Sequence, residues 1–181
     1  MLFRNRGWLP VPFLLVPLLS PGHESVTQWI GGALAVALGE AMRLAGVAAA
    51  GTVTRRRSRG VQRLVTYGMF AWVRNPLYVG NCLVWMGFVL ISGVFWFFPF
   101  AVALFALEYT LIVRYVEGVL ESIFGAEYLA YKGATPRWLP RPPRRAEHGA
   151  HEWGEAWRSE LSTFMQYAAL AAAFAVKARV F

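Results

Sequence analysis

Long runs of apolar residues, each close to the length of a membrane-spanning helix, dominate this chain. A helix that crosses a bilayer needs about 20 predominantly apolar residues. Such runs cover residues 28–53, 77–92 and 94–113, with a proline-interrupted run at 8–20 and another apolar run at 161–176. A chain of 181 residues has room for one compact bundle. We therefore predict an all-α integral membrane bundle of four to five transmembrane helices.

The composition supports a membrane protein and excludes other classes. Hydrophobic residues make up 57% of the chain and charged residues 15%, whereas a soluble domain carries about 25% charged residues. Disorder requires low hydrophobicity, and a disulfide scaffold requires paired cysteines, whereas Cys82 is the single cysteine here. The net charge of +8 fits a nucleic-acid binder, but such proteins are rarely this apolar. We expect the lipid bilayer as a partner, and no nucleic acid.

The positions of the basic residues predict an orientation in the membrane. Cytoplasmic loops carry an excess of Lys and Arg. Basic residues precede the first apolar run (4–6), follow the second (55–63) and follow the fourth (114–145), whereas the connections at 21–27 and 92–93 contain none. We therefore expect a multi-pass protein with its N-terminus and the end of its four-helix core in the cytoplasm. The expected location is a bacterial inner membrane.

The apolar run at 161–176 fits this orientation less well. Lys177 and Arg179 follow it at once, so they would lie outside the cell if the run crossed the membrane. The run either crosses, lies in the interface or re-enters partway. Residues 140–149 are rich in Pro and Arg, which is typical of a loop. We divide the chain there into a transmembrane core, residues 1–140, and a C-terminal part, residues 141–181, packed on the core.

Three ionisable residues interrupt the apolar runs. Such residues are costly at membrane depth and usually face the interior of a bundle or a wet cavity. Glu40 and Arg43 lie three residues apart on one helix face. They form either an internal ion pair or part of a substrate pocket. Glu108 lies late in the fourth run.

The segment 65–81, VTYGMFAWVRNPLYVGN, joins the basic loop to the third run. Asn75-Pro76 ends one element and suits the first turn of a helix. Arg74 lies at the membrane boundary, where a guanidinium is able to hold a carboxylate through two parallel hydrogen bonds. The alternative is a helix-start turn with an arginine that extends to the interface.

The segment 117–132 predicts an amphipathic helix on the cytoplasmic face. Its apolar residues Leu120, Phe124, Tyr128 and Tyr131 recur at helical spacing. An extended stretch, Pro-Arg-Trp-Leu-Pro at 136–140, follows. By itself, this pattern is also that of a simple interfacial helix.

Together the two segments resemble signatures of the isoprenylcysteine carboxyl methyltransferase and phospholipid methyltransferase superfamily. Residues 74–80, RNPLYVG, are similar to its R-[HN]-P-x-Y-x-G pattern. Residues 117–125 are similar to its E-x-x-L-x-x-x-[FY]-G pattern, and 136–140 to the P-R-x-x-P that follows. The resemblance covers residues 39–140. Val116 stands where many members have the first of two glutamates, so the carboxylate role falls on Glu117.

The resemblance implies a methyltransferase whose cytoplasmic C-terminal segment binds S-adenosylmethionine. Arg74 or Arg137 is expected to bind the carboxylate of the cofactor, and Glu117 its ammonium or a ribose hydroxyl. Tyrosines are expected to wall the adenine or to face the sulfonium. The full set of expected cofactor-binding residues is Tyr67, Gly68, Arg74, Pro76, Tyr78, Gly80, Asn81, Glu117, Tyr128, Tyr131 and Arg137.

The expected acceptor is a lipophilic or small molecule with a carboxylate, amine or thiol. It would enter from the bilayer near Glu108 or near Glu40 and Arg43, which are the expected substrate-binding pair. Arg74 and Glu108 are the expected catalytic residues, and Glu108 would act as the base for a protonated amine.

Two other functions stay open. Membrane sterol and enone reductases resemble this superfamily in their C-terminal helices and use NADPH, whose 2′-phosphate the arginines would suit. A non-enzymatic membrane scaffold would use the same residues only as interfacial anchors. We expect no metal, because His148-x-x-His151-Glu152 lacks the zinc-helix order and any further ligand.

Overall fold

The computed structural model describes residues 10–23, 25–51, 63–143 and 148–180. Within these ranges every regular element is a helix, and none is a strand. The predicted all-α class is therefore confirmed. The arginines at 4–6, 55–59 and 144–145, on which much of the predicted orientation depends, lie outside the described residues.

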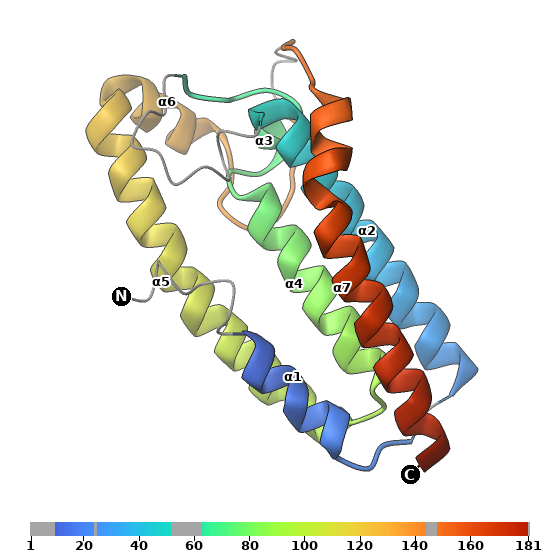
Figure 1. Cartoon of the computed structure of the whole chain (residues 1–181). Coiled ribbons are helices and arrows are strands. Elements are labelled where there is room, and N and C mark those ends of the chain that lie inside the picture. Colours follow the sequence, from blue (N-terminus) through green and yellow to red (C-terminus); the bar gives the residue numbers. More distant parts are fainter. Residues whose placement is uncertain (1–9, 24, 52–62, 144–147, 181) are drawn as a thin grey trace. The chain divides into compact units, whose positions relative to one another are not determined.

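Seven α-helices and one short 3-10 helix follow one another along the described chain. They are α1 (Pro10–Leu19), α2 (Val26–Ala50), α3 (Met69–Trp72), α4 (Pro76–Ile91), η3 (Phe95–Phe97), α5 (Phe98–Phe124), α6 (Ala126–Ala134) and α7 (Trp153–Val180). The α-helices are labelled in Figure 1.

Three helical segments are long and apolar enough to cross a membrane, by length and composition: α2, Phe95–Phe124 and α7. The apolar helix α4 is shorter, with 16 residues. The described part of α1 has 10 residues, whereas a helix that crosses a bilayer needs about 20. The protein is thus a multi-pass helical membrane protein, while the predicted fourth and fifth spans stay a prediction.

Two boundaries differ from those that the apolar runs predict. The fourth run and the start of the amphipathic segment form one continuous helix, α5, because no proline lies between Val113 and Phe124 and the helix accommodates Gly118. The break comes at Gly125, whose φ of +50° is one that residues with a Cβ rarely adopt. The short connection expected at residues 92–93 is confirmed, since α4 ends at Ile91 and η3 begins at Phe95.

The chain forms two compact units, and each long helix contributes to both. Unit 1 consists of residues 1–39, 82–112 and 162–181, and unit 2 of residues 40–81 and 113–161. The predicted division of the chain at residue 140 stays a prediction.

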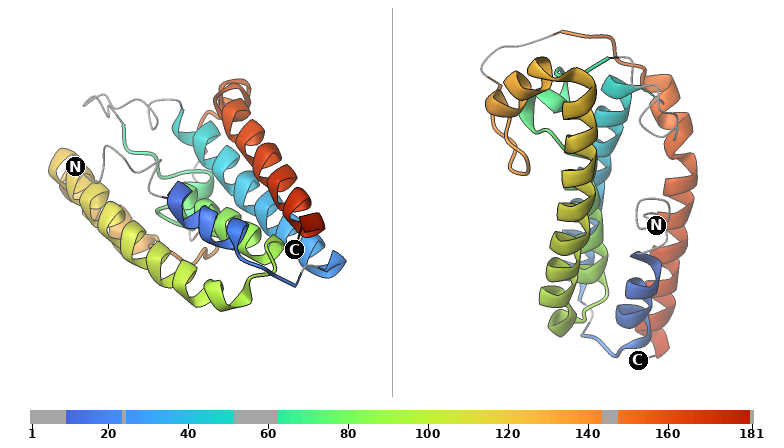
Figure 2. Two further views of the ribbon diagram at one scale, coloured as in Figure 1. Left: turned by 60° about the horizontal axis from the view of Figure 1, so that its bottom comes forward. Right: turned by 90° about the vertical axis from the view of Figure 1, so that its left-hand side faces the viewer.

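The core of unit 1 is built around Phe88 of α4 and Phe174 of α7. Their rings are stacked, with centroids 6.4 Å apart, and Tyr167 adds a third ring. Leu14 and Leu18 of α1 pack against the same cluster. Accordingly, α1 lies beside the C-terminal part of α7 in Figure 2. Near the end of α7, the buried Lys177 donates a hydrogen bond of 2.6 Å to the carbonyl oxygen of Ser92.

Helices α2 and α4 approach closely in unit 1, where two glycines meet. A Cβ at Gly32 would lie 2.5 Å from the carbonyl oxygen of Gly87, and a Cβ at Gly87 would lie 2.7 Å from that of Gly32. Small residues at such crossings let the backbones of membrane helices pack against each other.

Unit 2 contains the C-terminal parts of α2 and α5 and the N-terminal parts of α4 and α7. It also contains α3, α6 and the segments that connect them. Two backbone hydrogen bonds join these connections, from Arg74 N to Pro136 O at 2.9 Å and from Arg141 N to Trp72 O at 3.0 Å. The extended segment 136–141 therefore runs antiparallel to residues 72–74. This pairing brings the two segments that carry the sequence motifs together.

Candidate functional site

The carboxylate of Glu117 is the centre of the candidate site in unit 2. Glu117 lies near the end of α5 and is buried. Arg137 donates to it through two nitrogens, from Nη2 to Oε2 at 2.7 Å and from Nε to Oε1 at 3.1 Å. Nε of Arg74 lies 3.3 Å from the same Oε1. One buried carboxylate thus holds two guanidinium groups.

Asn75 ties this carboxylate to the backbone of the second motif. Its amide nitrogen donates to Glu117 Oε1 and to the carbonyl oxygen of Arg137, both at 3.3 Å. The residue is buried directly before Pro76, whose ring occupies the first turn of α4. Asn75 was not among the expected site residues, although the motif pattern already marks its position.

The guanidinium of Arg74 is fixed on a second side by α6. Its Nη1 donates to the carbonyl oxygen of Lys132 at 2.5 Å. The Arg74 side chain is 8% exposed, whereas that of Arg137 is 34% exposed. Arg137 is therefore the residue of the pair that a ligand can reach from solvent.

Two tyrosines of α6 lie next to this cluster of charged residues. Tyr128 is almost fully buried, and its ring centroid lies 6.0 Å from that of Tyr131. The hydroxyl of Tyr131 donates to the carbonyl oxygen of Phe70 at 2.8 Å, which fastens α6 to α3. Burial, with a further contribution from the charge of Glu117, raises the pKa of Tyr128 to about 12.

The charge of the cluster is positive by one unit. Two arginines face one glutamate, and the hydrogen bonds to Glu117 raise the pKa of Arg137 above its usual value. Arg137 binds Glu117 through Nε and Nη2, so its remaining edge presents Nη1. This donor set fits a ligand with a carboxylate, which Arg137 would hold through that edge.

Tyr67 connects the end of α2 with the segment before α7 in unit 2. Its hydroxyl, which has one proton to donate, lies within hydrogen-bond distance of the carbonyl oxygens of Ala49, at 2.9 Å, and Ala150, at 3.0 Å. The backbone of Gly149 lies so close to the Tyr67 ring that a Cβ there would come within 2.2 Å of it. Gly68 has a φ of +59°, and a Cβ there would lie 2.7 Å from Nε2 of His151. The segment 148–152 therefore packs directly against Tyr67 and Gly68, which precede the RNPLYVG motif.

Arg43 forms a separate polar cluster in unit 2. Its Nε donates to Glu40 at 2.9 Å, its Nη2 to both oxygens of Glu160 at 3.1 and 3.0 Å, and its Nη1 to the amide oxygen of Asn81. The predicted ion pair of Glu40 and Arg43 is confirmed. Glu160 was not predicted, and its signal in the sequence is a carboxylate at the edge of an apolar run.

Apart from Tyr67, Gly68, Glu40 and Arg43, which are described above, the expected site residues fall into three groups. Around the Glu117 carboxylate lie Arg74, Arg137 and Tyr128, with Tyr131 next to Tyr128. Pro76, Tyr78, Gly80 and Asn81 line the first turns of α4, in the same unit. Glu108 belongs to unit 1, where it is buried, and its Oε1 has no hydrogen-bond partner within the described residues.

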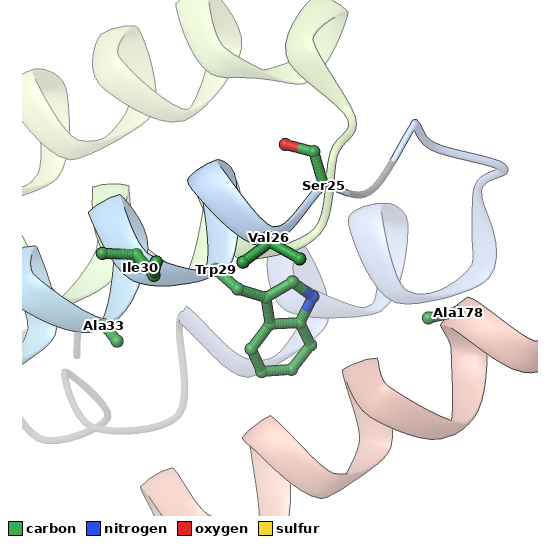
Figure 3. Close-up of a pocket in the computed structure, with 6 residues that line it drawn as sticks. All are labelled: Ser25, Val26, Trp29, Ile30, Ala33 and Ala178. Atoms are coloured by element: carbon green, nitrogen blue, oxygen red, sulfur yellow. The ribbon is translucent and has the colours of Figure 1, made fainter.

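Unit 1 also has an open hollow of about 510 Å³ (Figure 3). It is lined by Ser25, Val26, Trp29, Ile30, Ala33 and Ala178. It contains no charged side chain and none of the expected site residues. In the part of the chain that the structure describes, no group of three or more His, Cys, Asp or Glu side chains is arranged to hold a metal ion.

Comparisons with known proteins agree with the motifs. Residues 27–127 match the family model described as phospholipid methyltransferase. The chain is 32% identical over 144 residues to the protein-S-isoprenylcysteine O-methyltransferase of Homo sapiens, which is 74% of this chain and 48% of that protein. It is 31% identical over 140 residues to the enzyme of the same name from Mus musculus, at 72% and 48% coverage.

The chain thus spans about half the length of the curated relatives it matches. No solved structure matches it significantly. The family match includes Arg74, Asn75 and Glu117, whereas Arg137 and Glu160 lie beyond it. Because the match covers more than half of the chain and contains both motif cores, this protein belongs to the phospholipid methyltransferase family, as the motifs predict.

Proposed function

We propose that this protein is a membrane-embedded methyltransferase that uses S-adenosylmethionine. The proposal rests on the buried Glu117 carboxylate between Arg74 and Arg137, because the three residues belong to the segments that resemble signatures of the family. The proposed acceptor is lipophilic or small and carries a carboxylate, an amine or a thiol. Three helical segments long and apolar enough to cross a membrane support access from the bilayer.

The amino-acid end of S-adenosylmethionine carries a carboxylate and an ammonium. In our proposal, Arg137 binds the carboxylate through the edge that faces away from Glu117, with Arg74 as the second cation. Glu117 provides the negative charge for the ammonium or accepts from a ribose hydroxyl. The net positive charge of the cluster supports this assignment, because the carboxylate of the ligand would neutralise it.

The side chains of α4 and α6 complete the proposed cofactor site. Tyr128 stays neutral at physiological pH, because its pKa is about 12. A neutral aromatic ring is able to attract a sulfonium cation through its face. Tyr67, Gly68, Pro76, Tyr78, Gly80, Asn81 and Tyr131 are the remaining proposed cofactor contacts.

The cofactor, when bound, supplies an electrophilic methyl group, so the protein has little bond-making chemistry to perform. The proposed role of the chain is to orient the acceptor and to exclude water. A carboxylate or thiolate acceptor arrives as a nucleophile. A protonated amine would need a base, and Glu108 is the proposed one. The proposed contact of the acceptor with Glu40 and Arg43 rests on their burial in α2.

We also propose that the N-terminus and the cofactor site face the cytoplasm. The support is the asymmetry of the basic residues, which follow α2 and α5 but are missing from the turn between α4 and α5.

Calorimetry on the purified protein in detergent tests the proposed cofactor. We expect binding of S-adenosylmethionine or its demethylated product, and loss of binding in Arg74→Ala and in Glu117→Ala. Glu121→Ala is the matched control, because this α5 carboxylate is exposed and pairs with Lys132 instead. Undiminished binding in both site variants contradicts the site. Stabilisation by NADPH in place of S-adenosylmethionine would favour the reductase, and stabilisation by neither ligand a scaffold.

A further inference from the structure

The polar cluster of unit 2 around Arg43 joins three helices. Glu40 and Arg43 belong to α2, Asn81 to α4 and Glu160 to α7. All three nitrogen groups of the Arg43 guanidinium are engaged: Nε with Glu40, Nη2 with Glu160 and Nη1 with Asn81. The carboxylates of Glu40 and Glu160 therefore determine the orientation of the Arg43 guanidinium. The guanidinium in turn determines which way the amide of Asn81 faces.

Glu160 is the most deeply buried of the residues that contact the Arg43 guanidinium. Its side chain is fully buried, and both of its oxygens accept from the same nitrogen of Arg43. A buried guanidinium that loses such a partner is costly, so it would turn towards another acceptor. The position of the Arg43 guanidinium thus depends on Glu160.

Asn81 receives its orientation from Arg43. A guanidinium has only donors, so the amide oxygen of Asn81 must face it, and the NH₂ group must point away from Arg43. Asn81 directly follows Gly80, at the end of the motif that begins with Arg74. The direction of the Asn81 NH₂ group therefore depends, through Arg43, on Glu160 of α7.

We propose that Glu160 is a positioning residue of the methyl-donor site, and that it acts through Arg43 on the amide of Asn81. This inference rests on the proposed function, because it needs Asn81 to contact the cofactor. It gives the C-terminal helix, which lies beyond the residues matched by the family, a role in cofactor binding.

We call the chain of contacts from Glu160 through Arg43 to Asn81 the relay. A double-mutant cycle on cofactor affinity tests it. The affinity of S-adenosylmethionine is measured by calorimetry for the wild type, Glu160→Gln, Asn81→Ala and the double variant. We expect each single variant to bind about 10-fold more weakly, and the double variant to bind no more weakly than Asn81→Ala alone. Glu155→Gln is the control, because it makes the same change at an exposed position of α7 and should leave affinity unchanged.

A merely structural role of Glu160 would give a different result. The losses from Glu160→Gln and Asn81→Ala would then be independent and would multiply, which overturns the relay. Equal affinity of Glu160→Gln and the wild type overturns it as well. If Glu160→Gln does not fold, Glu160→Asp, which keeps the charge but withdraws it by one methylene, replaces it in the cycle. A wild type that binds no S-adenosylmethionine contradicts the proposed function itself.

Discussion

Arg137 Nη2 lies 2.7 Å from Glu117 Oε2, and Arg137 Nε lies 3.1 Å from Glu117 Oε1. The two residues are 20 positions apart, and the turn at Gly125 together with α6 brings them face to face. The hydrogen bonds to Glu117 raise the pKa of Arg137 above its usual value. One edge of the guanidinium remains for a ligand.

Replacing Arg137 by lysine should weaken cofactor binding. A lysine ammonium cannot form two parallel hydrogen bonds with Glu117 and still offer an edge to a ligand carboxylate. We expect Arg137→Lys to bind S-adenosylmethionine about 10- to 100-fold more weakly by calorimetry. Arg141→Lys, at an exposed position four residues further on, is the control and should bind like the wild type. Equal affinity of both variants would exclude the proposed carboxylate contact.

The buried Tyr128 predicts a loss of stability at high pH. Its pKa is about 12 in the folded protein and about 10.0 in the unfolded chain. Between these values the folded state holds a proton that the unfolded state has lost, so the free energy of unfolding falls as the pH rises. Below pH 10 this contribution is fully present.

Unfolding in detergent at several pH values between 9 and 12 measures this effect. We expect the wild type to lose stability more steeply than Tyr128→Phe, which lacks the titrating hydroxyl. The absorbance of tyrosinate should show a late component that disappears in the same variant. Parallel stability curves for the two proteins would refute the prediction.

The contact between Gly32 and Gly87 predicts opposite effects at neighbouring glycines. Gly32→Ala places a methyl group against the carbonyl oxygen of Gly87, so the helices must separate. Overpacking of this kind costs about 1–3 kcal/mol, and we expect a lower Tm in detergent. Gly31 has open space around it, so Gly31→Ala should keep the Tm or raise it slightly through higher helix propensity. Equal Tm values for the two variants would show that the crossing is looser than described.

The sequence predicts much of this fold, because membrane helices are encoded locally. The apolar runs that predict α2 and α4 end within a few residues of the observed helices, and the Ser92-Gly93 turn lies where expected. The end of α5 was harder to place, since amphipathic spacing alone does not say where a helix breaks. Only the positive φ of Gly125 shows that the break falls there.

The candidate site depends on contacts that local patterns do not encode. Arg74, Glu117 and Arg137 were predicted as one site only through their resemblance to a family, and the structure gives the distances among them. Glu160 was missed, because its partner Arg43 is 117 residues away in the sequence. The motif pattern allows His or Asn at position 75 and indicates no contact for the side chain, whereas in the structure Asn75 links the carboxylate to the backbone of Arg137.

Transfer of a labelled methyl group from S-adenosylmethionine shows directly whether this protein is a methyltransferase. The purified protein is incubated with methyl-labelled S-adenosylmethionine and a membrane extract, and the labelled product is isolated and identified. We predict a labelled lipophilic or small molecule with the wild type and with Glu121→Ala, and none with Arg74→Ala or Glu117→Ala. Equal labelling by the wild type and both site variants, or no labelling by the wild type, would contradict the account.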